Sequence, residues 1–85
     1  MIRSEGLHSA LYALNSALVR ARVMAFKREP HDKIAKVLDV AELLPMLIAR
    51  KDDTTAEFRR CLESLLSIDP AFGAALQRFD SDGPP

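Results

Sequence analysis

The chain has 85 residues, of which 48% are hydrophobic and 28% are charged, and its twelve Lys and Arg balance twelve Asp and Glu. A chain of this length makes one domain, and its isolated core supplies so little net stability that oligomerisation is a common remedy. The balanced charge gives no general attraction to nucleic acid or to anionic membranes. The single cysteine, Cys61, excludes an intramolecular disulfide and a cysteine-paired zinc site.

Composition and apolar runs also indicate the class and the location of the protein. Frequent Ala and Leu and the absence of Trp favour helices over strands, so the sequence predicts an all-α fold. No run reaches the ~20 apolar residues of a membrane span, and His8, Asn15 and Ser16 interrupt the apolar residues near the N-terminus. With a lone cysteine that suits a reducing compartment, we expect a cytoplasmic protein with no membrane partner.

The first predicted helix begins at Ser4 as its N-cap, runs to about Arg28 and is ended by Pro30. Two apolar stripes follow its turns, with a polar seam of His8, Asn15 and Arg22 between them. One stripe comprises Leu7, Leu11, Leu14, Leu18, Ala21 and Ala25, and the other comprises Tyr12, Val19, Val23 and Phe26. We expect the leucine stripe to face the core and the second stripe to need another surface, supplied by the rest of a bundle or by a partner chain.

The second predicted helix starts near Asp32 and repeats the double pattern. Its two apolar sides comprise Ile34, Val37, Leu38, Ala41, Leu44 and Ile48 on one side, and Val40, Leu43 and Leu47 on the other. Pro45 interrupts this pattern, which predicts a kink or a break near Leu43 and Leu44. If the two helices fold back on each other, Arg22 and Asp39 lie at similar distances from the turn, so we expect them to pair.

Two shorter helices complete the pattern. Thr54 and Glu57 fit a capping box at the start of a helix over 54–67, with Asp53 as the alternative cap, and this helix buries Phe58, Cys61, Leu62, Leu65 and Ile68. Asp69 followed by Pro70 opens a last helix that buries Phe72, Ala75, Leu76 and Phe79. We therefore expect one domain over 1–79, a flexible tail over 80–85, and a four-helix bundle built on a long N-terminal hairpin, with five helices if Pro45 breaks the second one.

The residues that could carry chemistry at neutral pH are few. His8, His31 and Cys61 are not grouped by the local sequence, and Cys61 lies in an apolar stripe where a thiol packs as a small hydrophobic group. Asp39 and Glu42 are spaced as neighbours on a helix, but no Glu-x-x-His motif accompanies them. The sequence therefore predicts no enzyme, no metal site and no cofactor.

The surplus apolar surface and the absence of catalytic motifs favour a protein-interaction module, an adaptor, regulator or inhibitor-like subunit, that acts as a homodimer with a further protein partner. The expected interface comprises the second stripes of the two long helices: Tyr12, Val19, Val23, Phe26, Val40, Leu43 and Leu47. The alternative is a nucleic-acid accessory protein that uses the basic segment 20–36, which holds six basic and two acidic residues. A metal-binding or enzymatic protein is a further alternative.

Overall fold

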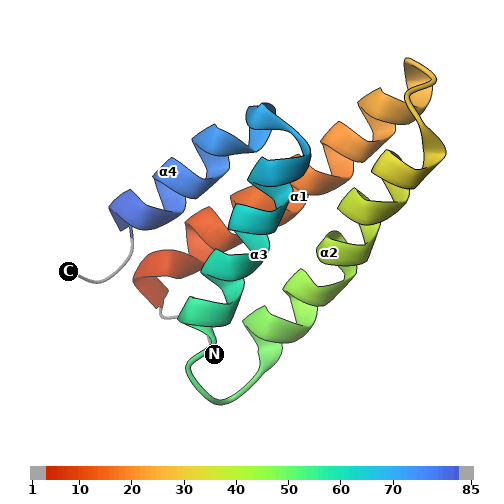
Figure 1. Ribbon diagram of the computed structural model, residues 1–85. Helices are drawn as coiled ribbons and strands as arrows, with labels where there is room; N and C mark the ends of the chain where they lie inside the picture. Colours follow the sequence, from red (N-terminus) through yellow and green to blue (C-terminus); the bar gives the residue numbers. More distant parts are fainter. Residues whose placement is uncertain (1–3, 83–85) are drawn as a thin grey trace.

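Four α-helices and one 3-10 turn make up the residues 4–82 that this computed structural model describes. They are α1 (Ser4–Phe26), α2 (His31–Ala49), α3 (Thr55–Ile68), η1 (Pro70–Phe72) and α4 (Gly73–Asp82). α1 and α2 form one antiparallel hairpin, and α3 and α4 form a second (Figure 1). The hairpins pack so that α1 and α3 each contact both α2 and α4. The predicted all-α bundle on a long N-terminal hairpin is confirmed.

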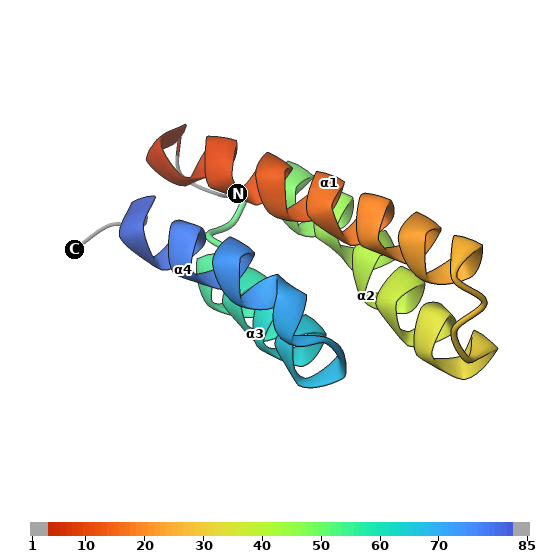
Figure 2. The same ribbon diagram turned by 90° about the horizontal axis from the view of Figure 1, so that it is seen from above.

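The two hairpins differ in length. α1 and α2 have 23 and 19 residues, whereas α3 and α4 have 14 and 10. The end of the first hairpin, where α1 passes into α2, therefore projects beyond the second hairpin (Figure 2). The last turns of α1 lie in this projecting part.

The core face of α1 is built from small side chains. Ala10, Ala13, Ala17, Ala21 and Met24 are buried. The prediction that the leucine stripe faces the core is wrong for Leu11 and Leu18, which are each 50% exposed, whereas Ala21 is buried and Leu14 packs against the core. Since α1 packs against two neighbouring helices, a stripe of alanines lets both approach closely, and leucines on that face would hold the helices apart.

The other three helices bury the faces that the sequence predicts. α2 contributes Val37, Ala41 and Leu44, α3 contributes Phe58, Leu62 and Leu65, and η1 with α4 contributes Phe72, Ala75 and Phe79. Leu38 of α2 is the exception, because it is 39% exposed. The rings of Phe58 and Phe79 stack with centroids 5.0 Å apart and join α3 to α4.

α1 ends in a Schellman motif. The amide of Glu29 donates to the carbonyl of Met24 (3.0 Å), and the amide of Arg28 donates to the carbonyl of Ala25 (3.1 Å). The motif requires a left-handed residue, and Arg28 has φ 57°. Pro30 then precedes α2, whose first turn carries Asp32.

The break expected near Pro45 does not occur, because α2 continues as one helix from His31 to Ala49 with Pro45 inside it. Pro45 is exposed, so its ring lies on the outer side of the helix. Proline has no amide hydrogen, so the helix omits the bond that residue 45 would donate to the carbonyl of Ala41. The bundle therefore has four α-helices among residues 4–82, and the five-helix alternative is wrong.

The predicted capping box at the start of α3 also does not form. Thr54 is buried, and its hydroxyl donates to the carbonyl of Leu47 in α2 instead of capping α3. Asp53 takes the capping role, because its carboxylate accepts from the amide (3.0 Å) and the hydroxyl (2.6 Å) of Thr55. Thr54 thus ties the α2–α3 loop to the end of α2.

α4 extends further than expected. The helix continues to Asp82, and the Asp80 carboxylate accepts two bonds from the Arg59 guanidinium, each 2.9 Å long. The flexible tail expected from residue 80 is therefore helical as far as residue 82, and the rest of it, 83–85, lies outside the described residues. Within residues 4–82, none of the helices combines the length and apolar composition needed to cross a membrane.

Candidate interaction surfaces

The residues with the most reactive side chains do not form a catalytic or metal-binding site in the described structure. His8 and His31 are exposed. Cys61 is half-buried on α3, and this burial raises the pKa of its thiol above the ordinary value, so the thiol is protonated and weakly nucleophilic at neutral pH. In the described part of the chain, His, Cys, Asp and Glu form no cluster of three or more that could hold a metal ion.

The structure separates the predicted interface residues into two groups. On α1, Tyr12, Val19 and Val23 lie on the side next to α4 and η1. The guanidinium of Arg78 in α4 lies 4.5 Å from the centre of the Tyr12 ring, and Val19 and Val23 line a depression together with residues of η1. Phe26 lies in the same strip beyond the end of the second hairpin, and it is 90% exposed.

The α2 members of that set lie on another side of the bundle. Lys33, Val40 and Leu47 recur every seven residues and share one stripe of α2. The carbonyl of Leu47 accepts from the hydroxyl of Thr54 at the start of α3, so this end of the stripe lies next to α3. Val40 and Leu47 are half-buried there, whereas Leu43 is exposed beside them. The expected interface is thus not one continuous surface.

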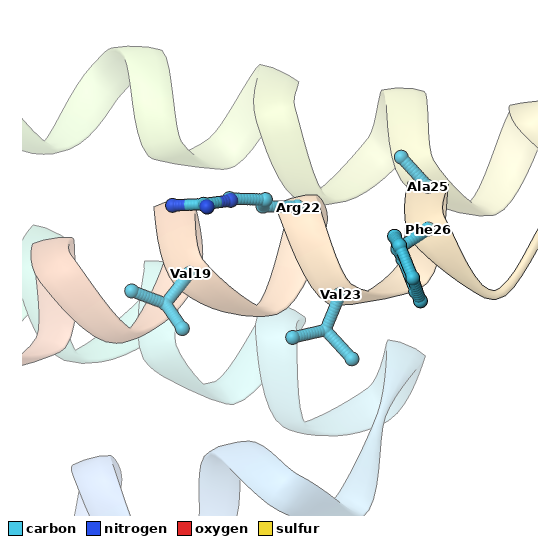
Figure 3. Close-up of a pocket in the computed structure, with 5 residues that line it drawn as sticks. All are labelled: Val19, Arg22, Val23, Ala25 and Phe26. Carbon is cyan, nitrogen blue, oxygen red and sulfur yellow. The ribbon is translucent and has the colours of Figure 1, made fainter.

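A different apolar surface, which the sequence analysis did not foresee, spans α1 and α2. Leu11, Leu18 and Ala25 recur every seven residues on α1, on the side turned from α4 toward α2. Figure 3 shows that α1 has two different sides here. Ala25 points toward α2, whereas Val19 and Val23 point toward η1. On α2, Leu38 and Pro45 share the stripe on the side away from Val40, next to α1.

Exposed apolar residues of α1 and α2 lie at matching heights along the hairpin. Because the hairpin is antiparallel about the turn at 27–30, Leu18 lies level with Leu38, and Leu11 lies level with Pro45 and Met46. Leu38 and Met46 are 39% and 64% exposed. We name the set Leu11, Leu18, Leu38, Pro45 and Met46 the leucine face. The seven-residue recurrence of leucines at 11 and 18 is the sequence signal that could have identified it.

The two edges of the leucine face carry opposite charges. Arg22 lies beside the face on α1, Glu42 lies between Leu38 and Met46 on α2, and Asp39 lies beyond Met46 on the outer side of α2; all three are exposed. The expected pair between Arg22 and Asp39 does not form within the chain, because their charged groups do not come within 4.0 Å of each other. These charges therefore remain available to groups outside the hairpin.

The second apolar surface follows α1 alone. We name Tyr12, Val19, Val23 and Phe26 the α1 strip. Beside it, Ser16, Val19, Arg20, Val23, Ala71 and Phe72 line a depression of about 250 Å³ where α1 meets η1. A larger depression of about 640 Å³ continues around Phe26 (Figure 3).

One ion pair fixes the junction of α1 with η1. The Nε of Arg20 donates to the Asp69 carboxylate at 2.9 Å, and the amide of Ala71 donates to its other oxygen, also at 2.9 Å. Asp69 is only 4% exposed. The bond from Ala71 and the Arg20 charge together hold the pKa of Asp69 below its ordinary value, so it is ionised at neutral pH.

The basic segment 20–36 is partly neutralised by the fold. Arg20 pairs with Asp69, and Lys33 pairs with Glu29 at 3.0 Å. The exposed basic side chains of the segment are Arg22, Lys27, Arg28 and Lys36. The fold therefore reduces the charge that this segment can offer to a nucleic acid.

Comparisons with protein-family models, with curated proteins and with solved structures gave no match to the chain.

Proposed function

We propose that this protein is a homodimeric protein-interaction module, and that two copies associate through the leucine face. The observation that carries the proposal is that both helices of one hairpin expose large apolar side chains, Leu11 and Leu18 on α1 and Leu38 and Met46 on α2. Exposed apolar patches of this kind on soluble proteins mark interaction sites.

The size of the leucine face suits a dimer of moderate affinity. α2 has 19 residues. At ~1.5 Å per residue and about 10 Å per helix width, the whole exposed side of the first hairpin, with the leucine face as its apolar centre, is roughly 28 Å by 20 Å, on the order of 600 Å² per copy. A pair of such faces buries about 1,200 Å², which is the lower end of specific interfaces. We expect dissociation in the micromolar range.

The edge charges favour one arrangement of the two copies. A two-fold axis parallel to the helices places α1 of one copy over α2 of the other, with neighbouring helices antiparallel. Arg22 of one copy then lies near Asp39 of the second copy, and the same pair repeats on the other side of the axis. The charges left unpaired within each chain are satisfied between chains.

Sedimentation equilibrium of two neighbouring variants tests this proposal. Leu18 and Val19 are both 50% exposed but lie on different sides of α1. We expect Leu18→Asp to abolish the dimer and Val19→Asp to leave it unchanged, with equal helix content by circular dichroism. A monomer for the wild-type chain at several hundred micromolar, or loss of the dimer with Val19→Asp alone, would contradict the leucine face.

A charge exchange tests the arrangement of the copies. Arg22→Glu and Asp39→Lys should each weaken the dimer, because each places like charges across the interface. The double variant should restore most of the affinity, since the pair re-forms with its signs reversed. If the double variant is as weak as the sum of the single variants, the two-fold arrangement is excluded while the leucine face can still form the interface.

A further inference from the structure

The α1 strip is a second unpartnered apolar surface, and it points in another direction from the leucine face. Its members Tyr12, Val19 and Phe26 recur every seven residues, with Val23 beside them. From Tyr12 to Phe26 the strip is roughly 21 Å long at ~1.5 Å per residue. Phe26 is 90% exposed, and Val19 is 50% exposed. A helix of about four turns matches this length.

The fold gives the strip the shape of a step. The depression of about 250 Å³ lies where α1 meets Ala71 and Phe72 of η1. Beyond η1, the first hairpin projects past the second one, so the Phe26 end of the strip has no neighbour from that hairpin (Figure 2). In Figure 3, Val19 and Val23 point toward η1, where they line this depression. One added helix could therefore pack on α1 and against the side of η1.

The charged side chains described around the strip are basic. Arg78 lies over the Tyr12 ring at one end. Lys27 is exposed at the other end, next to Phe26, and Arg22 is exposed between the strip and the leucine face. Asp69, the carboxylate at the base of the step, is buried and paired with Arg20. The strip thus offers an apolar centre with positive charge at both ends.

This charge pattern disfavours a second copy of the chain at the strip. Two strips facing each other would bring Arg22, Lys27 and Arg78 of both copies together, and like charges across an interface weaken association. An amphipathic helix with acidic flanks would instead bury the apolar centre and neutralise the basic ends. The leucine face differs, because its two edges have opposite signs.

We propose that the α1 strip binds an acidic amphipathic helix of a partner protein, about 14 to 16 residues long. Apolar side chains of that helix pack on Val19, Val23 and Phe26, and its Asp and Glu residues pair with the basic side chains at the two ends. The inference rests on the proposed role as an interaction module, but it does not depend on the dimer.

A displayed peptide library tests the proposal without a known partner. The library consists of 16-residue peptides with leucine fixed at helical spacing and with the outward positions drawn equally from Asp, Glu, Lys, Arg, Gln and Ser. We expect selection on the full chain to enrich acidic peptides. Enrichment of basic or neutral peptides, or no enrichment, would overturn the proposal.

Matched variants locate the binding site of the selected peptides. Because Phe26 is almost fully exposed, Phe26→Asp leaves the core intact and should weaken an acidic peptide about ten-fold or more, as loss of an aromatic anchor does. Lys27→Glu should weaken the peptide as well, and more strongly at low salt. Leu43→Asp changes an exposed leucine on α2, away from the strip, and should have no effect. Peptides insensitive to Phe26→Asp would exclude the strip.

Two further measurements separate this inference from its rivals. A 20-base-pair DNA duplex that binds the wild-type chain but not Arg22→Glu or Lys27→Glu, with no acidic peptide selected, would assign the basic ends to nucleic acid and overturn the proposal. The selection is repeated on Leu18→Asp, which lacks the dimer contact. If this variant selects acidic peptides, the proposal for the α1 strip is supported even if the dimer proposal fails. If the wild-type chain dimerises but selects no acidic peptide, only the proposal for the α1 strip is refuted.

Discussion

Arg28 occupies a backbone conformation that glycine adopts more easily. Its φ of 57° closes the Schellman motif at the end of α1, and its side chain is exposed. The left-handed region is disfavoured for residues with a Cβ atom. The chain therefore accepts a local cost at the turn between its two longest helices.

We predict that Arg28→Gly stabilises the protein by ~1 kcal/mol, because glycine removes the Cβ clash at this position. Arg28→Ala is the control, since it removes the same charge but keeps the Cβ atom, and it should give no such gain. Urea denaturation followed by circular dichroism measures both differences. Equal effects of the two substitutions would show that the charge of Arg28, not its backbone, decides the stability of the turn.

Asp69 makes the stability of the fold depend on pH. Its pKa is lowered in the folded state from an ordinary value of 3.8, first by the Ala71 amide and then by Arg20. The contribution of ionised Asp69 to the free energy of unfolding is therefore complete at pH values above the ordinary pKa. This contribution is lost as the pH falls from about that value through the folded-state pKa.

We predict that Asp69→Asn lowers the free energy of unfolding at pH 6, and that this effect becomes smaller as the pH falls below 3.8 and the wild-type carboxylate takes up its proton. Denaturation of both proteins across this range measures the difference. A difference that stays constant over the whole range would mean that Asp69 acts through its shape and not through its charge.

At the scale of the element, the alanine face of α1 decides how the helices pack. Ala13 and Ala17 are fully buried where α1 meets its neighbours. A larger side chain there has to displace a neighbouring helix, because native cores contain few voids.

We predict that Ala17→Leu destabilises the bundle by ~1–3 kcal/mol through overpacking. Ala56→Leu, an equal change at an exposed position of α3, should alter stability by less than ~0.5 kcal/mol. Thermal or urea denaturation gives both values. If Ala17→Leu is tolerated as well as Ala56→Leu, the close approach of the helices does not depend on the alanine face.

Helix positions could be predicted from the sequence, but the orientation of α1 could not. Pro30, Thr54 and Pro70 mark boundaries that the structure keeps within one or two residues. On α3 and α4 one apolar stripe is clearly the strongest, so their buried faces follow directly, and on α2 the larger of two stripes is the buried one apart from Leu38. α1 has three apolar stripes, and the choice among them depends on the size of the neighbouring side chains, which hydrophobicity alone does not encode.

The candidate surfaces were predictable to a similar degree. The stripe of Tyr12, Val19 and Phe26 was identified from its spacing, and it is exposed. Its combination with Val40 and Leu47 could not be tested by periodicity, because the spacing of residues within a helix does not say which neighbour each side faces. Proline rules likewise predict a break at Pro45, whereas packing of Val37, Ala41 and Leu44 on one continuous face keeps α2 whole.

At the scale of the whole molecule, the proposed dimer links stability to protein concentration. Any species that binds the folded chain and not the unfolded chain raises the apparent stability by mass action. If two copies associate through the leucine face, folding and association are coupled, as expected for a chain with so small a core.

We predict that the melting temperature of the wild-type chain rises with protein concentration between about 1 and 300 micromolar, across the expected dissociation range. The melting temperature of Leu18→Asp should not depend on concentration. Differential scanning calorimetry at several concentrations provides the measurement. Parallel behaviour of the two proteins would mean that the leucine face adds nothing to the stability of the fold.

The contact between α1 and α4 also has a consequence for how the protein is made. α1 cannot be fully covered until Phe79 has been synthesised, about 50 residues after α1 is complete. At ~5–20 residues per second, translation of that stretch takes roughly 3 to 10 s. Throughout this interval the growing chain presents a helix with three apolar stripes, so the ribosome-bound chain is the form of this protein with the greatest need of a chaperone.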